Sequence, residues 1–281
     1  MAQKRIILIT GCSTGIGKAL AEAFIRNNDL VYATARNPET LKPLAALGAQ
    51  AARLDVTDGE NIKMVLARIQ AEQGRLDLLV NNAGYATIGP LIEMPLTELR
   101  RQFDTNVIAP IALCQQALPL LRKSENGIIV NIGSVSGIFT TPFAGAYCAT
   151  KSALHALSDA LRMEIKPFGI QVVTVQPGAI RSDFGKTAFS SVSRNVPRNS
   201  LYASIMSAIH NRATASQDNP TPAEEFSQKL VEALNQKNPP LVIRIGYGSQ
   251  SLRLMKRLIP ERLLDLILAG KFSLNQLKIT D

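Results

Sequence analysis

Short apolar runs alternate with longer amphipathic segments along most of the chain. The first run, residues 6–9, is rich in β-branched residues and has no polar position, which is typical of a strand buried on both faces of a parallel sheet. Further strands are expected near residues 30–35, 50–55, 76–81, 127–133, 170–175 and 241–245. Helices are expected near residues 16–27, 39–47, 59–73, 97–122, 147–167 and 222–237. Because parallel strands need crossover helices, the pattern predicts an α/β fold: a doubly wound parallel seven-stranded sheet with helices on both faces, in one domain over residues 1–281.

Two regions depart from this alternation. Residues 185–221 are rich in Ser, Asn and Arg and exceed an ordinary connection in length, so they are expected to form a substrate lid or a mobile insertion. They follow the sixth strand, at the edge where open α/β sheets bind their ligands. Residues 250–279 combine apolar stripes with basic side chains. This tail is either a helix in a membrane interface or an apolar face that closes the substrate pocket or a subunit contact.

Composition excludes several classes of protein. Of the 281 residues 46% are apolar and 19% are charged, which excludes charge-driven disorder. The net charge of +9 permits anionic partners, but no helix-turn-helix, zinc or RNP motif supports nucleic-acid binding. The three Cys and two His residues have no metal-ligand spacing, so no metal site is expected. No apolar stretch approaches 18 residues, so we expect a protein that stays in the cytoplasm or reaches a membrane only peripherally.

A glycine-rich segment, T-G-C-S-T-G-I-G at residues 10–17, follows the first strand. Gly11 permits a tight turn, Gly15 lets the backbone approach a pyrophosphate, and Gly17 lets strand and helix pack closely. The helix that starts at Ile16 directs its N–H groups and its positive end toward the same place. The spacing is a variant of the dinucleotide-binding motif and does not fit a P-loop. The alternative is a glycine-rich turn without a ligand.

The end of the second strand carries Arg36 and no nearby carboxylate. A carboxylate there would accept a hydrogen bond from the adenosine ribose of NAD, whereas a basic residue accommodates the 2′-phosphate of NADP. Ser13 offers a hydroxyl to the same phosphate. These residues favour NADP, and the alternative is a solvated surface arginine.

Tyr147 and Lys151 are four residues apart on a predicted helix and therefore share a face. A neighbouring ammonium favours the phenolate, so Lys151 is expected to lower the pKa of Tyr147 and to hold the nicotinamide ribose. Ser134 follows the fifth strand, where its hydroxyl can bond a substrate carbonyl. By itself the Tyr-Lys pair is also compatible with an exposed helix pair. His155, one turn after Lys151, is interpreted as a packing or hydrogen-bonded residue.

Taken together, these motifs resemble the short-chain dehydrogenase/reductase family over nearly the whole chain. The resemblance rests on the glycine motif and on Asp55-Val56, Asn81-Asn82-Ala83-Gly84, Asn106, Ser134, Tyr147, Lys151 and Pro177-Gly178. It implies a Rossmann fold and a catalytic tetrad of Asn106, Ser134, Tyr147 and Lys151. It further implies cofactor contacts from Gly11, Ser13, Gly15, Ile16, Gly17, Arg36, Asp55, Val56, Asn82, Ala83, Gly84, Tyr147, Lys151, Pro177, Gly178, Ile180 and Ser182. Ser182 stands where the family more often has Thr, and it keeps the hydroxyl.

Within the family, the chain looks like 17β-hydroxysteroid and retinol dehydrogenases, and still more like acyl-dihydroxyacetone-phosphate reductases. The second likeness rests on residues 222–226 and on the basic, Leu-rich tail. The resemblance implies an NADP-dependent enzyme that interconverts a carbonyl and an alcohol on a lipophilic substrate (a steroid, a retinoid, a long-chain compound or an acyl-dihydroxyacetone phosphate). It also implies a homo-oligomer. The alternative is a catalytically silent dinucleotide-sensing or scaffold protein of the same fold.

Overall fold

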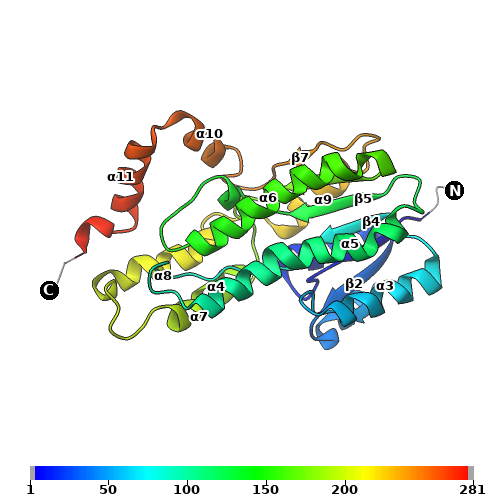
Figure 1. Ribbon diagram of the computed structural model, residues 1–281, viewed down its shortest axis with the longest axis horizontal. Helices are drawn as coiled ribbons and strands as arrows, with labels where there is room; N and C mark the ends of the chain where they lie inside the picture. The colour runs from blue at the N-terminus through cyan, green and yellow to red at the C-terminus, as the bar shows by residue number, and fades with distance from the viewer. Residues whose placement is uncertain (1–3, 278–281) are drawn as a thin grey trace.

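A seven-stranded parallel sheet forms the centre of the computed structural model, which describes residues 4–277 (Figure 1). The strand order is β3-β2-β1-β4-β5-β6-β7. The strands are β1 (Ile6–Ile9), β2 (Leu30–Ala35), β3 (Gln50–Arg53), β4 (Leu78–Asn81), β5 (Ile128–Ile132), β6 (Gln171–Val175) and β7 (Val242–Ile243). Every pair of neighbouring strands is parallel. The predicted doubly wound α/β fold is confirmed.

The strand order reverses between β1 and β4. The chain runs outward from β1 through β2 to β3, then returns to place β4 on the other side of β1. The register pairs Ile9 with Val80, so both strands end at the same level. In such sheets the crevice beyond the carboxyl ends at this reversal is where ligands bind. The topology therefore places the predicted glycine-rich turn and the segment after Asn81 next to each other.

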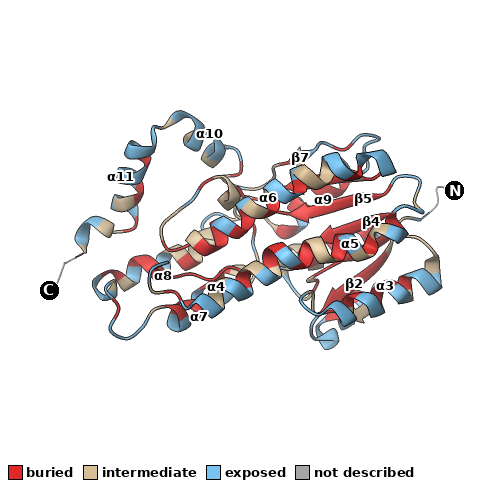
Figure 2. Ribbon diagram, in the orientation of Figure 1, coloured by how far each residue is buried: buried red, intermediate tan, exposed pale blue. Residues whose placement is uncertain are grey.

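Helices cover both faces of the sheet. The helices on the sheet are α1 (Gly15–Arg26), α2 (Lys42–Ala46), α3 (Gly59–Gln73), α5 (Ala109–Leu121), α6 (Gly145–Ile165) and α9 (Ala223–Leu234). One apolar core lies between one sheet face and α1 and α9, and a second lies under α3, α5 and the end of α6. Figure 2 shows their buried residues on the sides that face the strands. The strands β1, β4 and β5 are buried at every position and carry mostly apolar side chains, whereas the edge strand β3 is only partly buried.

The helix predicted over residues 97–122 contains a wider turn in its middle. The helix α4 (Leu96–Phe103) continues through a π-helical turn, Asp104–Ile108, into α5. Such turns insert one residue into an α-helix and are frequent at functional sites. Apolar periodicity alone does not reveal this change.

The region predicted as a lid or insertion is largely helical. It forms α7 (Phe184–Asn195) and α8 (Met206–Thr214), with short 3₁₀ turns at Ala203–Ile205 and Ala215–Gln217. Ala188 and Val192, four residues apart, are buried on one side of α7. A helix rich in Ser can form here because these few apolar positions pack in an apolar cluster that also contains Ile209 and Leu268. That it acts as a lid remains a prediction.

The C-terminal segment forms two helices at some distance from the sheet (Figure 1). They are α10 (Ser251–Leu258) and α11 (Glu261–Lys271). Leu264, Leu268 and Phe272 are buried in a third apolar cluster, which also contains Tyr147. Residues 278 and 279 of the predicted tail lie outside the described residues. None of the helices formed by residues 4–277 is both long and apolar enough to cross a bilayer.

Candidate active site

Thr10 ties the turn after β1 to the turn after β4. Its hydroxyl oxygen accepts hydrogen bonds from the backbone N–H groups of Asn82 (3.0 Å) and Ala83 (2.9 Å). The Asn82 side chain donates in return to the carbonyl oxygens of Thr10 (2.8 Å) and Gly11 (3.1 Å). This reciprocal bonding holds the two segments together at the point where the strand order reverses. Thr10 belongs to the glycine motif and acts as a positioning residue.

The glycines of the motif are required by close approaches. Gly11 has a φ of +73°, in the left-handed region that favours glycine. A Cβ atom on Gly17 would lie 2.3 Å from the Gly11 carbonyl oxygen, so any side chain there would displace backbone. The expected packing of strand against helix at Gly17 is therefore present.

The N-terminus of α1 offers free donors to an anion. Thr14 at the N-cap makes no side-chain hydrogen bond to the helix, and the first turn has no acidic residue. The first N–H groups of a helix lack partners within it and carry its positive end. Ser13 and Ile16 flank this terminus, and both are only partly buried. This arrangement fits the pyrophosphate of a dinucleotide.

Arg36 directly follows β2 and is exposed. Burial acts to raise the pKa of the Asp55 carboxyl, but hydrogen bonds from Thr57 and the charges of Arg36 and Arg53 hold it below its ordinary value. Among the described residues Arg36 forms no ion pair, so its guanidinium is available to a ligand. Val56 and Ala83 line one small crevice together with Thr10 and Asn81.

Tyr147 and Lys151 lie on one face of α6, as their spacing predicts. The Lys151 ammonium is 5.9 Å from the centre of the Tyr147 ring and donates a 2.7 Å hydrogen bond to the carbonyl oxygen of Ile132. Ser134 follows β5, and its side-chain oxygen accepts from the N–H of Ser136. The structure therefore brings Ser134, Tyr147 and Lys151 together beyond the end of β5.

The protonation of this group is governed by burial. Burial raises the pKa of the Tyr147 phenol to about 12, while its hydrogen bond with the Ser134 side chain acts in the opposite direction. Burial also lowers the pKa of the Lys151 ammonium to about 8. The spacing predicts that Lys151 lowers the pKa of Tyr147, but in the structure desolvation of the phenol dominates and the opposing influences come from Ser134 and Arg212.

Asn106 lies in the π-helical turn and reaches the same region. Its side-chain nitrogen donates to the carbonyl oxygen of Tyr85 (2.9 Å) and to the Thr150 hydroxyl (3.1 Å), and its oxygen accepts from the N–H of Tyr85 (3.2 Å). A Cβ atom on Gly84 would lie 3.1 Å from the Asn106 side-chain oxygen and 3.7 Å from the Lys151 nitrogen. The four residues predicted as a tetrad are thus neighbours in space.

His155 supports the backbone around Ser134. The N–H of Ser134 is 3.4 Å from His155 Nε2, which accepts from it. The imidazole also packs closely against two glycines. A Cβ atom added to Gly133 would lie 2.2 Å from the ring, and one added to Gly137 would lie 2.5 Å from it. Burial and the charge of Lys151 lower the pKa of His155 to about 4, so the ring is neutral at pH 7. The interpretation of His155 as a hydrogen-bonded packing residue agrees with this geometry.

The segment after β6 closes the opposite side of the crevice. The carbonyl oxygen of Pro177 accepts from the N–H of Val135 at 2.9 Å. A Cβ atom on Gly178 would lie 2.0 Å from the carbonyl oxygen of Tyr247. Ile180 is buried, and Ser182 faces Gly15, where an added Cβ would lie 2.9 Å from the Ser182 Cβ. The predicted cofactor residues after β6 therefore border the glycine-rich turn.

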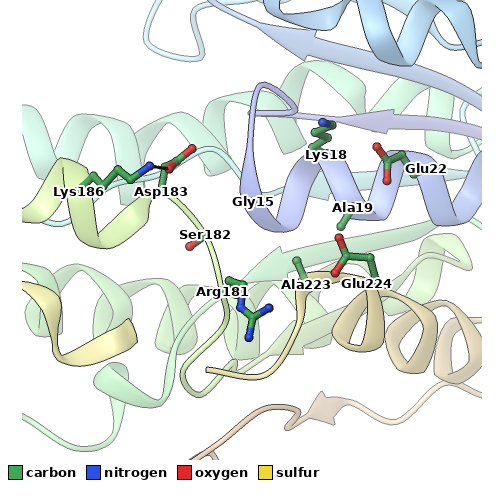
Figure 3. A pocket seen from close by; sticks show the side chains of 10 residues that line it. All are labelled: Gly15, Lys18, Ala19, Glu22, Arg181, Ser182, Asp183, Lys186, Ala223 and Glu224. Carbon is green, nitrogen blue, oxygen red and sulfur yellow. Dashed lines mark ion pairs between the residues drawn. The ribbon is translucent and has the colours of Figure 1, made fainter. Parts of the chain in front are cut away.

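A pocket of about 430 Å³ opens beside Gly15 and Ser182 (Figure 3). Its remaining lining residues are Lys18, Ala19, Glu22, Arg181, Asp183, Lys186, Ala223 and Glu224. Lys186 pairs with Asp183, and the lining carries three basic and three acidic side chains. This balance of charge favours no particular ligand, so we treat the pocket as the border of the cofactor crevice.

The third apolar cluster surrounds Tyr147 on the side away from the sheet. The ring of Phe184 lies 5.4 Å from that of Tyr147, and Phe143, Ile209 and Leu268 belong to the same cluster. Arg212 of α8 donates to the Thr141 hydroxyl in the segment before α6, and its charge opposes the rise that burial causes in the pKa of Tyr147 and of Cys148. Sequence reasoning missed Arg212. The available signal was a basic residue at an apolar-periodic position of the predicted lid.

Comparison with known proteins agrees with this geometry. The family model of short chain dehydrogenases matches residues 5–193. The NADPH-dependent 1-acyldihydroxyacetone phosphate reductase of Saccharomyces cerevisiae is 31% identical, over 97% of this chain and 93% of that protein. The 3-ketodihydrosphingosine reductase of Bacteroides thetaiotaomicron is 33% identical, over 87% of this chain and 88% of that protein.

A solved structure of a short-chain dehydrogenase has the same fold as this chain. A short-chain dehydrogenase from Streptomyces avermitilis is 33% identical and superimposes with a TM-score of 0.80, over 98% of this chain and 99% of that one. The members of this family are oxidoreductases that bind a nicotinamide dinucleotide. The sequence match, the sheet topology and the grouping of Ser134, Tyr147 and Lys151 agree. The chain belongs to the short-chain dehydrogenase/reductase family.

Proposed function

We propose that the protein is an NADP-dependent carbonyl reductase or alcohol dehydrogenase acting on a lipophilic substrate. The observation that carries the proposal is the grouping of Ser134, Tyr147 and Lys151 beyond β5, at the same edge of the sheet as the N-terminus of α1. The nucleotide, the carbonyl that accepts the hydride and the proton donor would then lie together beyond the ends of β1 and β4, where the strand order reverses. The proposal assigns the catalytic role to these three side chains, with Asn106 as their neighbour.

Each side chain has a separate task in carbonyl reduction. When bound, the nicotinamide supplies a hydride to the carbonyl carbon. The Ser134 hydroxyl hydrogen-bonds the carbonyl oxygen, and the Tyr147 phenol gives that oxygen a proton. A phenol whose pKa is about 12 is protonated at neutral pH, which suits a donor. The ammonium of Lys151 stabilises the phenolate that this transfer leaves and returns a proton to it.

Arg36 supports NADP over NAD. Its guanidinium is exposed directly after β2 and has no carboxylate partner among residues 4–277. A free guanidinium binds a phosphate with charge-assisted hydrogen bonds. The yeast relative is named as NADPH-dependent, which agrees with this preference.

The apolar surroundings of Tyr147 support a lipophilic substrate. Phe184, Phe143 and Leu268 approach this side of the active site, and the two named relatives are reductases of lipid-like ketones by name. The decisive experiment is oxidation of NADPH and NADH in the presence of an acyl-dihydroxyacetone phosphate, a steroid ketone and a retinaldehyde. We expect turnover of at least one substrate with NADPH preferred. Tight NADPH binding without turnover of any carbonyl would instead support the silent dinucleotide-binding alternative.

We further propose that the protein is a cytoplasmic homo-oligomer whose tail meets anionic membranes peripherally. Leu254, Leu258 and Leu266 are more than half exposed on the outer side of α10 and α11, next to exposed basic residues. Apolar and basic side chains together are typical of helices that lie in a membrane interface. Light scattering of the purified protein tests the oligomer.

Vesicle binding tests the membrane contact. Leu258→Ser/Leu266→Ser should release the protein from anionic vesicles, whereas Leu47→Ser/Met64→Ser, at exposed positions on the sheet side, should not. Binding should weaken as salt shortens the Debye length from ~30 Å at 0.01 M to ~10 Å at 0.1 M. Point substitutions are preferable to truncation, because removing α11 would uncover the cluster around Tyr147. Equal co-sedimentation of both double variants would contradict the proposal.

A further inference from the structure

Arg212 lies on the buried side of α8. Ala208, Ile209 and Ala213 are buried in the cluster that contains Tyr147. Residues 208 and 212, like residues 209 and 213, are one helical turn apart and share that side. Arg212 is therefore a charged residue at a position whose neighbours are apolar. Buried charges are costly unless they are paired or bonded.

The partners of Arg212 within the protein are neutral. Its Nε donates a 2.7 Å hydrogen bond to the hydroxyl of Thr141, in the segment before α6. No carboxylate among the described residues forms an ion pair with it, and its terminal nitrogens make no side-chain hydrogen bond there. Asp183 is paired with Lys186, and Glu93 accepts from Ser200 and Leu201. Both of these carboxylates have partners other than Arg212.

The titratable groups that Arg212 meets are the phenol of Tyr147 and the thiol of Cys148. Burial raises the pKa of both groups, so neither supplies a negative charge at pH 7. The terminal nitrogens of a guanidinium form a planar fork that matches the oxygens of a phosphate or carboxylate. An arginine without an anionic partner, next to the reacting phenol, is a binding group for an anion that arrives with the substrate.

We propose that Arg212 binds an oxyanion of the substrate, so that the enzyme reduces a carbonyl compound with an apolar chain and an anionic head group. This inference rests on the proposed function and narrows its substrate class. The carbonyl would lie at Ser134 and Tyr147, the oxyanion at Arg212, and the chain against the apolar cluster. Because Arg212 and Tyr147 are neighbours, the anionic group stands only a few bonds from the carbonyl.

The test compares two ketones that differ by one phosphate. We use 1-hexanoyl-dihydroxyacetone phosphate and 1-hexanoyl-dihydroxyacetone, and measure kcat/KM for each with NADPH. Loss of a charge-assisted pair corresponds to roughly a 10- to 100-fold change. Arg212→Met should therefore lower the ratio of kcat/KM for the phosphate ester to that for the neutral ester by about 10- to 100-fold. Arg212→Lys, which keeps the charge without the fork, should lie between the two.

Arg194→Met is the matched control. Arg194 lies on α7, where its guanidinium is exposed and bonded to the carbonyl oxygen of Ser190. The control should keep the wild-type ratio. An equal loss on both esters in Arg212→Met, or a wild type without preference for the phosphate, would overturn the proposal, because Arg212 would then act on Tyr147 or on the fold.

A binding measurement separates this proposal from the proposed function. The phosphate ester is titrated calorimetrically into NADP⁺-saturated wild type and Arg212→Met. A dissociation constant that rises about 10- to 100-fold in the variant supports an anion site even if no carbonyl is turned over. Equal affinities in the two proteins exclude it even if turnover is observed. Thermal unfolding of each variant checks that the fold is retained.

Discussion

The sheet region, which comprises residues 4–182 with α9 and β7, and the helical region, which comprises α7, α8, α10 and α11, are built on different principles. In the sheet region, the polar side chains around the crevice bond one another, as Asn81 does with Asn131 at 2.8 Å. In the helical region, contacts to Tyr147 are mostly apolar, and α10 and α11 leave several leucines exposed. A network of close hydrogen bonds fixes one arrangement of its side chains, whereas an apolar surface tolerates the exchange of one apolar side chain for another. Under the proposed function, the chemistry would take place in the sheet region and the helical region would select the substrate.

The largest effect is expected at Tyr147, where the two regions meet. Tyr147→Phe removes the proton donor and keeps the ring that packs against Phe184. Turnover should fall by at least the ~10²-fold typical of general acid catalysis. Stopped-flow kinetics and a parallel NADPH titration check this, and the cofactor affinity should stay close to that of wild type. High residual turnover would place the chemistry outside the sheet region.

Lys151 tests whether the sheet region tolerates a buried charge at the expense of stability. Burial lowers the pKa of its ammonium from 10.5 to about 8. Below pH 8 the folded and unfolded chains are both protonated there, so the cost of burying the charge is fully present. Between pH 8 and 10.5 the unfolded chain binds a proton that the folded chain has released, so stability rises with pH by about 3 kcal/mol.

The measurement compares wild type with Lys151→Met in urea unfolding at several pH values. The free energy of unfolding of wild type minus that of the variant should increase as the pH rises from 8 to 10.5. Other titrations are common to both proteins and cancel. A constant difference would show that Lys151 titrates at its ordinary value.

Arg36 sharpens the comparison on the cofactor side. Arg36→Ala should weaken NADPH binding by about 10- to 100-fold, the equivalent of ~1.5–3 kcal/mol for a charge-assisted hydrogen bond, and should leave NADH little changed. Fluorescence titration with both nucleotides provides the measurement. A wild type that already prefers NADH would contradict the assignment.

A pair of glycines provides the smallest and most direct contrast between the regions. A Cβ on Gly17 would meet the Gly11 carbonyl, whereas nothing lies within 4 Å of one on Gly270 in α11. Gly17→Ala should therefore destabilise the protein by ~1–3 kcal/mol through overpacking. Gly270→Ala should stabilise it by ~0.5–1 kcal/mol, because alanine loses less conformational freedom in a helix. If urea unfolding showed that both substitutions change the free energy of unfolding in the same direction, the contrast between the two regions would be contradicted.

The sheet region was the more predictable from sequence. Most positions of its strands are apolar, and the turns after the strands carry glycines and short polar residues that act on neighbouring positions. Asp58, which caps α3, and Gly74, which ends it in a left-handed conformation, fix that helix at its predicted bounds. Such signals lie within a few residues of the structure that they determine.

The helical region depends on contacts between distant residues. The helix α7 is rich in Ser, and its formation depends on burying Ala188 and Val192 against other segments. The contact between Arg212 and Thr141 joins residues 71 positions apart. The raised pKa of Tyr147 arises from burial by several segments, so the neighbour four residues away could not predict it. Periodicity and spacing do not contain this information.

The π-helical turn at Asp104–Ile108 has a consequence for the phase of a helix. Each residue of an α-helix advances the side-chain direction by ~100°, so one additional residue rotates everything that follows by that amount. Before and within the turn, Gln102 and Asn106 both donate to the carbonyl oxygen of Tyr85. After it, Leu113 and Ala117 face the sheet. Deleting one residue here would rotate the whole of α5 about its axis. The one inserted residue therefore lets a single continuous helix contact the Tyr85 backbone at one end and the sheet at the other.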